Sequence, residues 1–509
     1  MSELADGWTW ARISDITEKV PNEKPEDYPE KEFGYVDISS ICNSTYRITE
    51  AKRFKGKDAP SRARRPIRPN DILFSNVRTY LRNIAIVPPD TEAEICSTGF
   101  TVLRPSAAVD ARFLFRYVLT NNFIDRVTPQ QTGTHYPATS DRVVMSELIP
   151  LPPLNEQRRI VEVLEELLGK LEAYQKRLSK IPVILKRFGQ SVLAAACSGR
   201  LTADWRRLHA EGEQASAIVE KLREGRMIKA KSFAEREKLT LIYERIEEND
   251  SDDLPDSWRF TALNKLCSSF DYGTSAKSKP IGEVAVLRMG NVQNRRIDWR
   301  DLVYTSDRHE IQKYSLKPGT VLFNRTNSPE LVGKTAIYRG ERPAIFAGYL
   351  IRINASDALS PDYLNYCLST NKARDFCLSV KTDGVSQSNI NAQKLGTFEV
   401  PFCSLDEQQE IVRGVESLFK LADQIEGRYQ KAQREVDKLT QSILAKAFRG
   451  ELVPTEAELA RREGRDYEPA SVLLERIRTV RSNEAAVSPT TKANRFQDRR
   501  LSKGAGRKK

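Results

Sequence analysis

Apolar residues alternate at spacings of four and three along two segments of the chain. We call these the first repeat helix, residues 153–200, and the second repeat helix, residues 403–450. The alternating positions are Ile160, Leu164, Leu167, Leu171, Tyr174, Leu178, Ile181, Leu185, Phe188 and Val192, and then Ile411, Val415, Leu418, Ala422, Ile425, Tyr429, Ala432, Val436, Leu439 and Ile443. This period is typical of coiled-coil helices. We expect the two helices to pair, each being on the order of 65 Å long at 1.5 Å per residue.

One proline lies inside the first apolar seam. Pro182 does not disturb the spacing of the apolar positions on either side of it. A proline inside a helix removes one backbone hydrogen bond and bends the helix. We therefore expect a kink at Pro182 and not the end of the helix.

The two seams belong to a duplication that covers most of the chain. Glu156-Gln157 recurs as Glu407-Gln408, 251 positions later. The other matching pairs are Gln190-Ser191 with Gln441-Ser442, Asp6-Gly7-Trp8 with Asp256-Ser257-Trp258, Asp71-Ile72-Leu73-Phe74 with Thr320-Val321-Leu322-Phe323, and Thr98-Gly99-Phe100 with Ala347-Gly348-Tyr349. Repeats of this kind decide the architecture, and they indicate two similar halves in tandem.

The regions before the repeat helices combine short strand-like runs, such as Asp71 to Phe74, with helix-like runs, such as Ala111 to Asn121. This mixture predicts an α+β fold with two globular domains, separated by two long antiparallel coiled-coil helices and related by an internal pseudo-twofold repeat. The predicted parts are a first domain at 1–152, the first repeat helix at 153–200, a charged helical linker at 201–253, a second domain at 254–402, the second repeat helix at 403–450, a helical extension at 451–480 and a disordered basic tail at 481–509.

The net charge of +12 is unevenly distributed. Residues 481–509 carry nine Lys or Arg against two Asp or Glu, and their low apolar content predicts disorder. Within the first domain, Arg47 to Arg82 carry eleven Lys or Arg against three acidic residues. A basic stretch inside an otherwise neutral domain favours contact with nucleic acid, and a solvated loop is the alternative.

Composition and motifs disfavour several other kinds of site. Seven scattered cysteines and three separated histidines do not form the clusters that disulfide frameworks or zinc sites need. The chain shows no apolar run of membrane length and no charged-then-apolar leader, so we expect a cytoplasmic protein. Gly333-Lys334-Thr335 lacks the earlier glycine of a phosphate-binding loop, because Ser328 takes that position. We therefore expect no catalytic residue, metal or cofactor in this chain.

Loops in both halves carry side chains suited to nucleic acid. Arg and Asn can form paired hydrogen bonds with base edges, whereas Thr, Ser and Lys suit phosphates. The candidates are Arg62, Arg64, Arg65, Arg78, Tyr80, Arg82, Thr134, His135 and Tyr136 in the first half, and Tyr272, Thr274, Ser275, Lys277, Lys279, Arg288, Asn291, Asn324, Arg325, Thr326, Asn327, Ser328, Ser386 and Gln387 in the second. For any single residue, capping of a turn is an equal alternative.

The order of these parts resembles a known family, the specificity (S) subunits, or HsdS subunits, of type I restriction-modification systems. The resemblance rests on Leu154-Asn155-Glu156-Gln157 with Leu405-Asp406-Glu407-Gln408, on Arg288-Met289-Gly290-Asn291, and on the run from Leu322 to Ser328. It extends over nearly the whole chain. Together these motifs are specific, although each of them alone is weak.

The resemblance implies a DNA-reading subunit without catalysis of its own. Each domain would be a target recognition domain that reads one half of a split, asymmetric site on double-stranded DNA, and the helices would fix the distance between the halves. The implied partners are two methyltransferase subunits, which hold S-adenosylmethionine, and restriction subunits, which use ATP and Mg. Two alternatives from other classes are a coiled-coil adaptor between proteins and a stand-alone DNA methyltransferase or nuclease.

Overall fold

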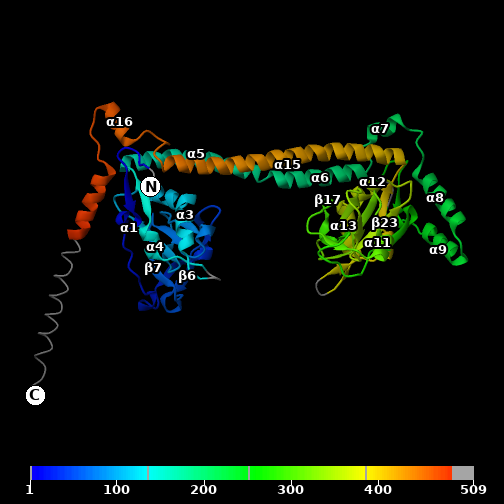
Figure 1. The fold of residues 1–509 in the computed structure, drawn as a ribbon, viewed down its shortest axis with the longest axis horizontal. Coiled ribbons are helices and arrows are strands. Elements are labelled where there is room, and N and C mark those ends of the chain that lie inside the picture. Colours follow the sequence, from blue (N-terminus) through cyan, green and yellow to red (C-terminus); the bar gives the residue numbers. More distant parts are fainter. Residues whose placement is uncertain (1–2, 134–136, 250–252, 385–386, 484–509) are drawn as a thin grey trace, which may run out of the picture. The chain divides into compact units, whose positions relative to one another are not determined.

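The structure is a computed structural model that describes residues 3–133, 137–249, 253–384 and 387–483 (Figure 1). Its contacts divide the chain into two units. Unit 1 consists of Met1–Leu178 and Lys431–Lys509, and unit 2 consists of Ser179–Gln430. The second repeat helix therefore contributes its first half to unit 2 and its second half to unit 1.

Unit 1 contains two four-stranded sheets and a pair of strands that leads into the first repeat helix. Its main elements are β1 (Thr9–Arg12), α1 (Ile13–Ile16), β2 (Thr17–Glu18), β3 (Glu32–Val36), β6 (Lys52–Lys55), β7 (Ala63–Pro66), β8 (Ile72–Ser75), η4 (Thr79–Leu81), β9 (Ile84–Ile86), β10 (Ala93–Ser97), β11 (Phe100–Pro105), α2 (Ala111–Val118), α3 (Asn121–Val127), η5 (Thr128–Gln130), α4 (Asp141–Ser146), β12 (Leu148–Leu151) and α5 (Leu154–Leu178). The sheets have the orders β6-β3-β10-β7 and β2-β11-β8-β9, and β1 pairs with β12.

The apolar strands and capped helices of unit 1 follow directly from its sequence. All four residues of β8 are buried, and β11 pairs with it in antiparallel register from Phe100 opposite Ser75 to Leu103 opposite Ile72. Helices α2, α3 and α4 begin at Asp110, Thr120 and Ser140, whose side chains accept hydrogen bonds from backbone amides of the first turn. These side chains satisfy donors that a helix start leaves unpaired.

Unit 2 repeats this arrangement. Its main elements are α6 (Ile181–Cys197), α7 (Ala203–Leu208), α8 (Ala215–Lys229), α9 (Phe233–Glu244), β13 (Arg259–Ala262), α10 (Leu263–Leu266), β14 (Cys267–Tyr272), β15 (Val284–Leu287), η6 (Met289–Asn291), β16 (Val292–Gln293), β17 (Arg295–Ile297), β18 (Val303–Thr305), α11 (Arg308–Tyr314), β19 (Thr320–Asn324), β20 (Thr326–Asn327), β21 (Thr335–Tyr338), β22 (Ala344–Phe346), β23 (Leu350–Ala355), α12 (Pro361–Cys367), α13 (Asn371–Val380), β24 (Thr382–Asp383), β25 (Ser388–Asn389), α14 (Ala392–Gly396), β26 (Glu399–Phe402) and the first half of α15 (Leu405–Ala447).

The sheet topology of the two units is the same where the sequences correspond. The order β14-β23-β19-β21 in unit 2 repeats β2-β11-β8-β9 in unit 1, and β18-β15-β22 repeats β6-β3-β10. The parallel pairing of β15 with β22 likewise matches that of β3 with β10. Two α+β domains are therefore present, as the duplication predicted.

The first repeat helix is interrupted, and the prediction of a mere kink at Pro182 was wrong. Helix α5 ends at Leu178, two turn residues follow, and α6 begins at Ile181 with Pro182 in its first turn. Proline has no N–H to donate to the carbonyl of Leu178, and its ring collides with that carbonyl. The second repeat helix has Gln433 at the corresponding place, and α15 continues without a break from Leu405 to Ala447.

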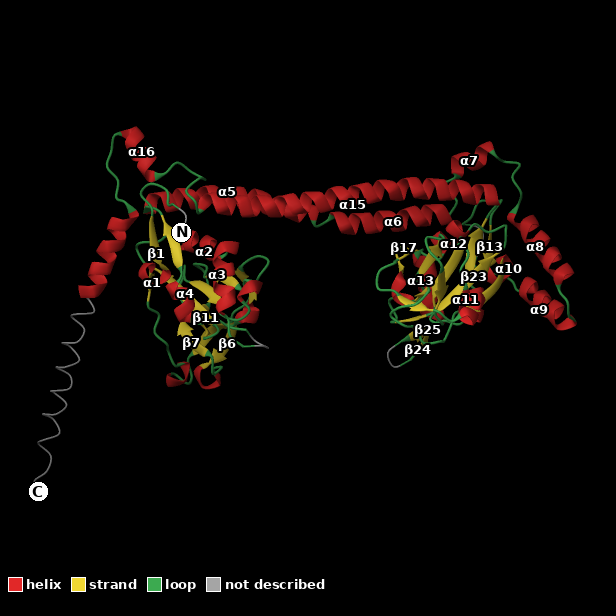
Figure 2. Cartoon of the chain, viewed as in Figure 1, coloured by secondary structure: helices red, strands yellow, loops and turns green. Residues whose placement is uncertain are grey.

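Packing of the repeat helices is tightest where each helix starts or ends. In unit 1, α5 lies beside the end of α15 (Figure 2), and Ile160 and Leu164 share a core with Leu444 and Ala447. In unit 2, the buried seam residues Ile411 and Val415 share a core with α6. Val436 is also buried, whereas Leu167, Leu171, Leu178, Leu185 and Leu418 are half-buried.

Three predicted seam positions were wrong, because their side chains face solvent. Tyr174 is 56% exposed, Leu439 is 51% exposed and Ile425 is 38% exposed. An α-helix has 3.6 residues per turn, so a seven-residue repeat drifts by about 20° per heptad around a straight helix. The same spacing therefore cannot keep every apolar position on the inner face of a long continuous helix.

The segments that follow the repeat helices are part of the units. Residues 201–253, predicted as a linker, belong to unit 2, and Arg226 of α8 donates to the backbone oxygens of Asn264 and Lys265 at 2.8 and 3.4 Å. In unit 1, α16 (Glu456–Glu463) is followed by helical residues 470–483, where Arg481 donates to the oxygens of Ser14 and Asp15 at 3.1 and 2.9 Å. Arg481 had been assigned to the disordered tail, of which residues 484–509 lie outside the described chain.

A buried glutamine fixes the start of each repeat helix to its domain. The Gln157 amide accepts from the Asp110 N–H at 2.8 Å and donates to the oxygens of Ala108 and Pro152 at 3.0 and 2.9 Å. Gln408 repeats this set with the N–H of Ser360 at 2.8 Å and the oxygens of Ala358 and Cys403 at 3.0 and 2.9 Å. Each glutamine thus links the repeat helix to the residue that caps α2 or α12.

The preceding glutamate holds the beginning of the same domain. Trp8 donates to Glu156 at 2.8 Å, and Trp258 donates to Glu407 at 2.8 Å. Each carboxylate also binds the segment that follows the other repeat helix: Glu156 accepts from the N–H of Glu456 at 2.8 Å, and Glu407 accepts from Thr202 at 2.7 Å and Arg206 at 2.9 Å. Burial raises the pKa of Glu156, an effect that the hydrogen bonds to its carboxylate oppose.

Replacement of Gln408 by alanine should destabilise unit 2. The Gln408→Ala substitution removes three hydrogen bonds and leaves the Ser360 N–H and two carbonyls unpaired inside the protein. We expect a loss of about 1–3 kcal/mol in the free energy of unfolding, measured by urea denaturation with tryptophan fluorescence. The neighbouring Gln409 is exposed, so Gln409→Ala should change that free energy by less than about 0.5 kcal/mol. Equal urea midpoints for the two variants would contradict this role of Gln408.

Candidate nucleic-acid interface

Two loops meet in each unit at the end of the sheet where β8 or β19 finishes. We call this the loop end. In unit 1, Val77 and Thr132 both form isolated bridges with Ala138. In unit 2, the corresponding β20 and β24 both pair with β25. The tips of these hairpins, with the candidates Thr134, His135, Tyr136 and Ser386, lie outside the described residues.

The loop after β8 presents an exposed tyrosine. Arg78 and Arg82 flank η4 with φ angles of +47° and +53°, a left-handed conformation that residues other than glycine adopt infrequently. Thr79 is buried, and its hydroxyl lies 2.8 Å from the hydroxyl of Thr128, which fixes the turn. Tyr80 is 52% exposed, and Arg82 donates to the side chain of Asn121.

The three arginines before β8 differ in their availability. Arg62 is exposed in the turn before β7, and its backbone oxygen accepts from Thr98 close to the loop end. Arg64 forms a two-pronged ion pair with Glu26, with distances of 2.7 and 2.8 Å. Arg65 is bound by Asp141. Within the described chain, the Arg62 side chain has no carboxylate partner, whereas Arg64 and Arg65 each have one.

Asp141 organises the loop end of unit 1, although the sequence did not point to it. Besides Arg65, its carboxylate accepts from the Asn76 amide at 3.0 Å and from the Thr101 hydroxyl at 2.8 Å. Asn76 follows β8, Thr101 belongs to β11, and Asp141 begins α4 directly after the hairpin. One carboxylate thus joins both loops to the sheet. A charge-assisted network of this kind makes a rigid support.

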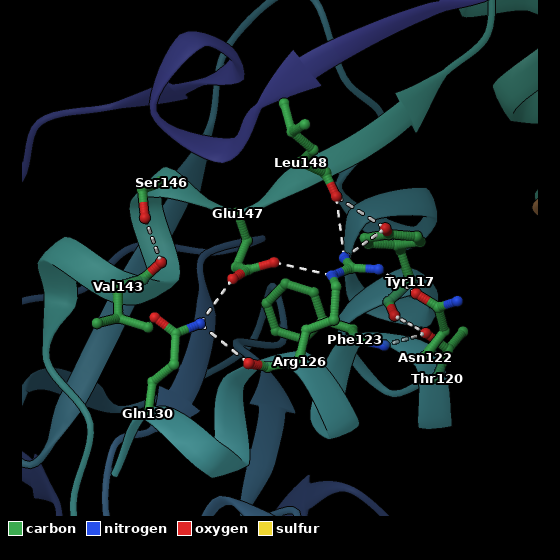
Figure 3. Close-up of polar contacts among 10 residues, drawn as sticks. All are labelled: Tyr117, Thr120, Asn122, Phe123, Arg126, Gln130, Val143, Ser146, Glu147 and Leu148. Atoms are coloured by element: carbon green, nitrogen blue, oxygen red, sulfur yellow. Dashed lines mark hydrogen bonds and ion pairs between the residues drawn. The ribbon is translucent and has the colours of Figure 1, made fainter. Parts of the chain in front are cut away.

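The base of the same hairpin is held by a second network (Figure 3). Arg126 donates to Glu147 at 2.8 Å and to the Tyr117 hydroxyl at 2.9 Å. Gln130, the last residue of η5, donates to Glu147 at 3.1 Å and to the oxygen of Arg126 at 2.9 Å. Glu147 directly precedes β12, so these contacts tie the hairpin to the strand that leads into α5.

Arg325 has the corresponding organising position in unit 2. It follows β19, as Asn76 follows β8, and its guanidinium donates to the Asn389 side chain at 2.7 Å and to the Gly348 oxygen at 3.4 Å. The same group lies 4.7 Å from the centre of the Tyr272 ring, a cation–π contact. The Tyr272 hydroxyl in turn accepts from the N–H of Ala392 at 2.8 Å. Arg325 therefore connects the loop after β19, the hairpin and the end of β14.

The loop from Gly273 to Lys279 supplies the exposed cations of this end. Thr274 is buried, and its backbone is bonded to Phe346 and Gly348 at 2.9 and 2.7 Å. A Cβ atom at Gly273 would lie 2.3 Å from the Phe346 oxygen, so this close approach requires glycine. Ser275, Lys277 and Lys279 are exposed, as is Gln387 at the hairpin.

Four candidates in unit 2 are buried, so their side chains are almost inaccessible at the surface. They are Thr274, Asn291, Asn324 and Thr326. The Asn291 amide donates to the oxygens of Asp298 and Arg300 at 2.9 and 3.1 Å, and its oxygen accepts from the Arg288 N–H at 2.9 Å. Arg288 is itself bonded to Asp301. The Arg288–Asn291 run therefore shapes the turn after β15, which is the capping alternative that the sequence left open.

Asn324 is fully buried without hydrogen-bond partners for its side chain among the described residues. Its backbone is nevertheless bonded to Lys334 and Gly333 at 2.8 Å each. Asn327 and Ser328 are half-buried, with the Asn327 oxygen accepting from the Ser328 N–H at 2.9 Å. At the hairpin, hydrogen bonds from Lys381 and Ser388 lower the pKa of Asp383.

The hairpin loop from Asp383 to Asn389 was also predicted from the sequence as a candidate, and its Asn389 is the partner of Arg325. One residue at the loop end was missed: Tyr349 is 47% exposed, and its backbone oxygen accepts from the Arg325 N–H at 3.0 Å. In unit 1 the backbone oxygen of Gly99 is in the equivalent position, where it accepts from the Asn76 N–H at 2.8 Å. The match of Gly99 with Gly348 was therefore wrong by one position, because strand register equates Gly99 with Tyr349.

Among the described residues, no group of three or more His, Cys, Asp or Glu side chains is placed to hold a metal ion. No helix in the same part of the chain is long and apolar enough to span a membrane.

Comparison with known proteins identifies the family. The family described as "Type I restriction modification DNA specificity domain" matches residues 5–182 and 255–434. The EcoKI specificity subunit of Escherichia coli is 27% identical over 521 residues, covering 97% of this chain and 98% of the relative. The EcoDI specificity subunit of Escherichia coli is 31% identical over 393 residues, covering 75% of this chain and 78% of the relative.

Solved structures agree with these relatives. One, described as "Structural basis underlying complex assembly and conformational transition of the type I R-M system", has a TM-score of 0.64 at 26% identity and covers 89% of this chain and 100% of its own. The HsdS subunit from Thermoanaerobacter tengcongensis has a TM-score of 0.54 at 26% identity and covers 89% and 99%. The family resemblance drawn from the repeated motifs is confirmed: the chain belongs to the specificity subunits of type I restriction-modification systems, whose function is DNA sequence specificity.

Proposed function

We propose that each unit reads one half of a split, asymmetric site on double-stranded DNA through its loop end. The observation that carries this proposal is that one scaffold recurs in both units with different side chains at the loops. In unit 1 the residue after the central strand is Asn76, which donates to Asp141. In unit 2 the corresponding residue is Arg325, which donates to Asn389. Two similar frames with different contact residues suit the reading of two different half-sites.

The exposed side chains at the loop ends have distinct roles in this proposal. Lys277, Lys279 and Arg62 neutralise phosphates and position the DNA. Tyr80, Tyr272 and Tyr349 each present between 43% and 52% of their surface, and they pack against the sugar or base edges. Gln387 is an exposed amide that can pair with a base edge. Arg325 acts through Tyr272 and Asn389, which it orients.

The repeat helices set the distance between the two half-sites and form the coiled coil of the subunit. The support is the continuity of α15, which runs for 43 residues and contributes to both units. A continuous helix of this length resists bending more than a flexible linker does. Two readers held at a fixed separation select one spacer length in the DNA.

Catalysis belongs to partner subunits in this proposal. Two methyltransferase subunits bring S-adenosylmethionine and flip the target adenines, and restriction subunits bring ATP and Mg. The complex acts in the cytoplasm, where its DNA lies. Support comes from the family itself, since the relatives are described as specificity subunits of restriction enzymes. Neither a protein adaptor nor a stand-alone enzyme is favoured by those matches.

Removal of the two exposed lysines of unit 2 should weaken DNA binding regardless of sequence. For the double variant Lys277→Ala and Lys279→Ala, we expect the slope of log affinity against log salt to fall by about 1 per lysine. The measurement is fluorescence anisotropy with the assembled complex at several salt concentrations. Lys238→Ala is the matched control, because Lys238 is exposed on α9, away from the loop end. An unchanged slope, or the same loss in the control, would contradict the proposed interface.

Shortening both repeat helices should shorten the DNA spacer. The deletion takes seven residues from α5 around Leu171 and seven residues from α15 around Thr440. These two parts of the helices face each other, because Leu171 and Thr440 line the same cavity. Seven residues span about 10 Å, which corresponds to roughly 3 base pairs. Selection of binding sites from random DNA with the assembled complex should return the original half-sites with a shorter spacer. Altered half-sites, or an unaltered spacer, would rule out this role for the helices.

A further inference from the structure

The two units contain equivalent surface cavities. The cavity in unit 1 has a volume of about 660 Å³ and the one in unit 2 about 700 Å³. Both are lined by the turn before the central strand of the sheet, which is β8 or β19, by the end of the neighbouring strand β11 or β23 with the residues after it, and by the first residue of α5 or α15. The corresponding lining residues are Arg68 with Lys317, Pro69 with Pro318, Ser106 with Ser356, and Leu154 with Leu405.

These cavities lie at the opposite end of the sheet from the loop end. Asp71 lines the first cavity and directly precedes β8, whereas the loop with Tyr80 follows the other end of that strand. Thr320, the first residue of β19, lines the second cavity, whereas Arg325 follows the last residue. A molecule seated in either cavity is therefore separated from the proposed DNA contacts by the length of the central strand.

Each cavity carries a surplus of positive charge. In unit 1, Arg104 is paired with Asp71 at 2.7 Å, and Arg112 is paired with Glu165 at 3.1 Å. Among the residues that the structure describes, Arg68 and Arg158 have no ion-pair partner, and Glu18 is the remaining unpaired carboxylate in this lining. Two unpaired cations thus face one unpaired anion.

The second cavity has the same balance although its residues differ. Arg352 is paired with Asp271 at 2.9 Å. Within the described part of unit 2, Lys313 and Lys317 lack an ion-pair partner, and Asp357 is the unpaired carboxylate of the lining. The residue that corresponds to Arg158 is the neutral Gln409, and the second unpaired cation of this cavity is Lys313 of α11. The surplus of one positive charge therefore recurs through a different residue.

We propose that each cavity receives an acidic segment of the methyltransferase subunit, with one copy of that subunit at each unit. This inference rests on the proposed function, which calls for two like partners. Two copies of one protein need two like surfaces, and the cavities are alike while the loop ends differ. The surplus positive charge attracts carboxylates and rejects basic segments. The first turn of α5 forms part of the cavity in unit 1, and the first turn of α15 forms part of the cavity in unit 2.

The test reverses the charge of one corresponding cation in each unit. The full-length variants Arg68→Glu, Lys317→Glu and the double variant are each co-expressed with the methyltransferase subunit, and the complexes are weighed by native mass spectrometry. Both side chains are exposed, so the fold should be unaffected, which circular dichroism checks. The unaltered chain should carry two methyltransferase subunits, and each single variant should carry one. The double variant should carry none, even when the methyltransferase concentration is tenfold above that needed to saturate the unaltered chain.

Matched controls are Lys24→Glu in unit 1 and Lys238→Glu in unit 2, both exposed cations outside the cavities. Rescue by Arg68→Lys and Lys317→Arg would support a charge contact. The inference is overturned if the double variant still binds two methyltransferase subunits with unchanged affinity. It is also overturned if the complex assembles normally but loses affinity for DNA, since the cavities would then hold phosphates. An unaltered chain that binds no methyltransferase subunit contradicts the proposed function and this inference together.

Discussion

A buried Glu-Gln pair at the start of each repeat helix is the constraint on which both units depend. The glutamine saturates its amide with one N–H and two carbonyls of the domain before it. The glutamate binds the tryptophan near the beginning of that domain. Buried polar groups are costly unless they are paired, so these contacts allow a single orientation of helix and domain. In the proposed function, the loop ends read DNA from sheets that these contacts fix to the helices.

The glutamates also explain how the duplicated chain closes on itself. Glu156 binds the segment after the second repeat helix, and Glu407 binds the segment after the first. Gly199 and Gly450 turn the chain into these segments with φ angles of +72° and +76°. A Cβ atom would lie 2.5 Å from Pro255 at the first glycine and 2.6 Å from Ala5 at the second. The similarity of the two halves is therefore concentrated where the repeat helices, the segments that follow them and the domains contact one another.

Much of the architecture could be predicted from the sequence, because repeats and periodicity report on packing that recurs. The duplication gave the two α+β domains and the long helices, and the repeated motifs gave the family. The break before Pro182 was missed because an apolar seam continues through a residue that cannot donate a backbone hydrogen bond. The exposure of Leu439 was missed because spacing alone does not reveal on which face of a long helix a neighbour lies.

The candidate interface was predicted less well, for a different physical reason. Residue type suggests which side chains can bind DNA, but only the fold decides which are already occupied. Asn291 and Arg65 have suitable chemistry and are engaged inside their units. Asp141 organises a loop end, although its negative charge alone would not suggest a place in a DNA-binding site. Tyr349 was assigned to the wrong register, because strand pairing sets that register.

The central claim is that two fixed units of one chain read two different half-sites. It is tested most directly by co-expressing the chain with its methyltransferase subunit and mapping methylated adenines across the genome of the host. The account predicts that every methylated adenine lies in one motif with two different half-sites and a spacer of constant length. Methylation without a sequence motif, or at a continuous or palindromic motif, would contradict it.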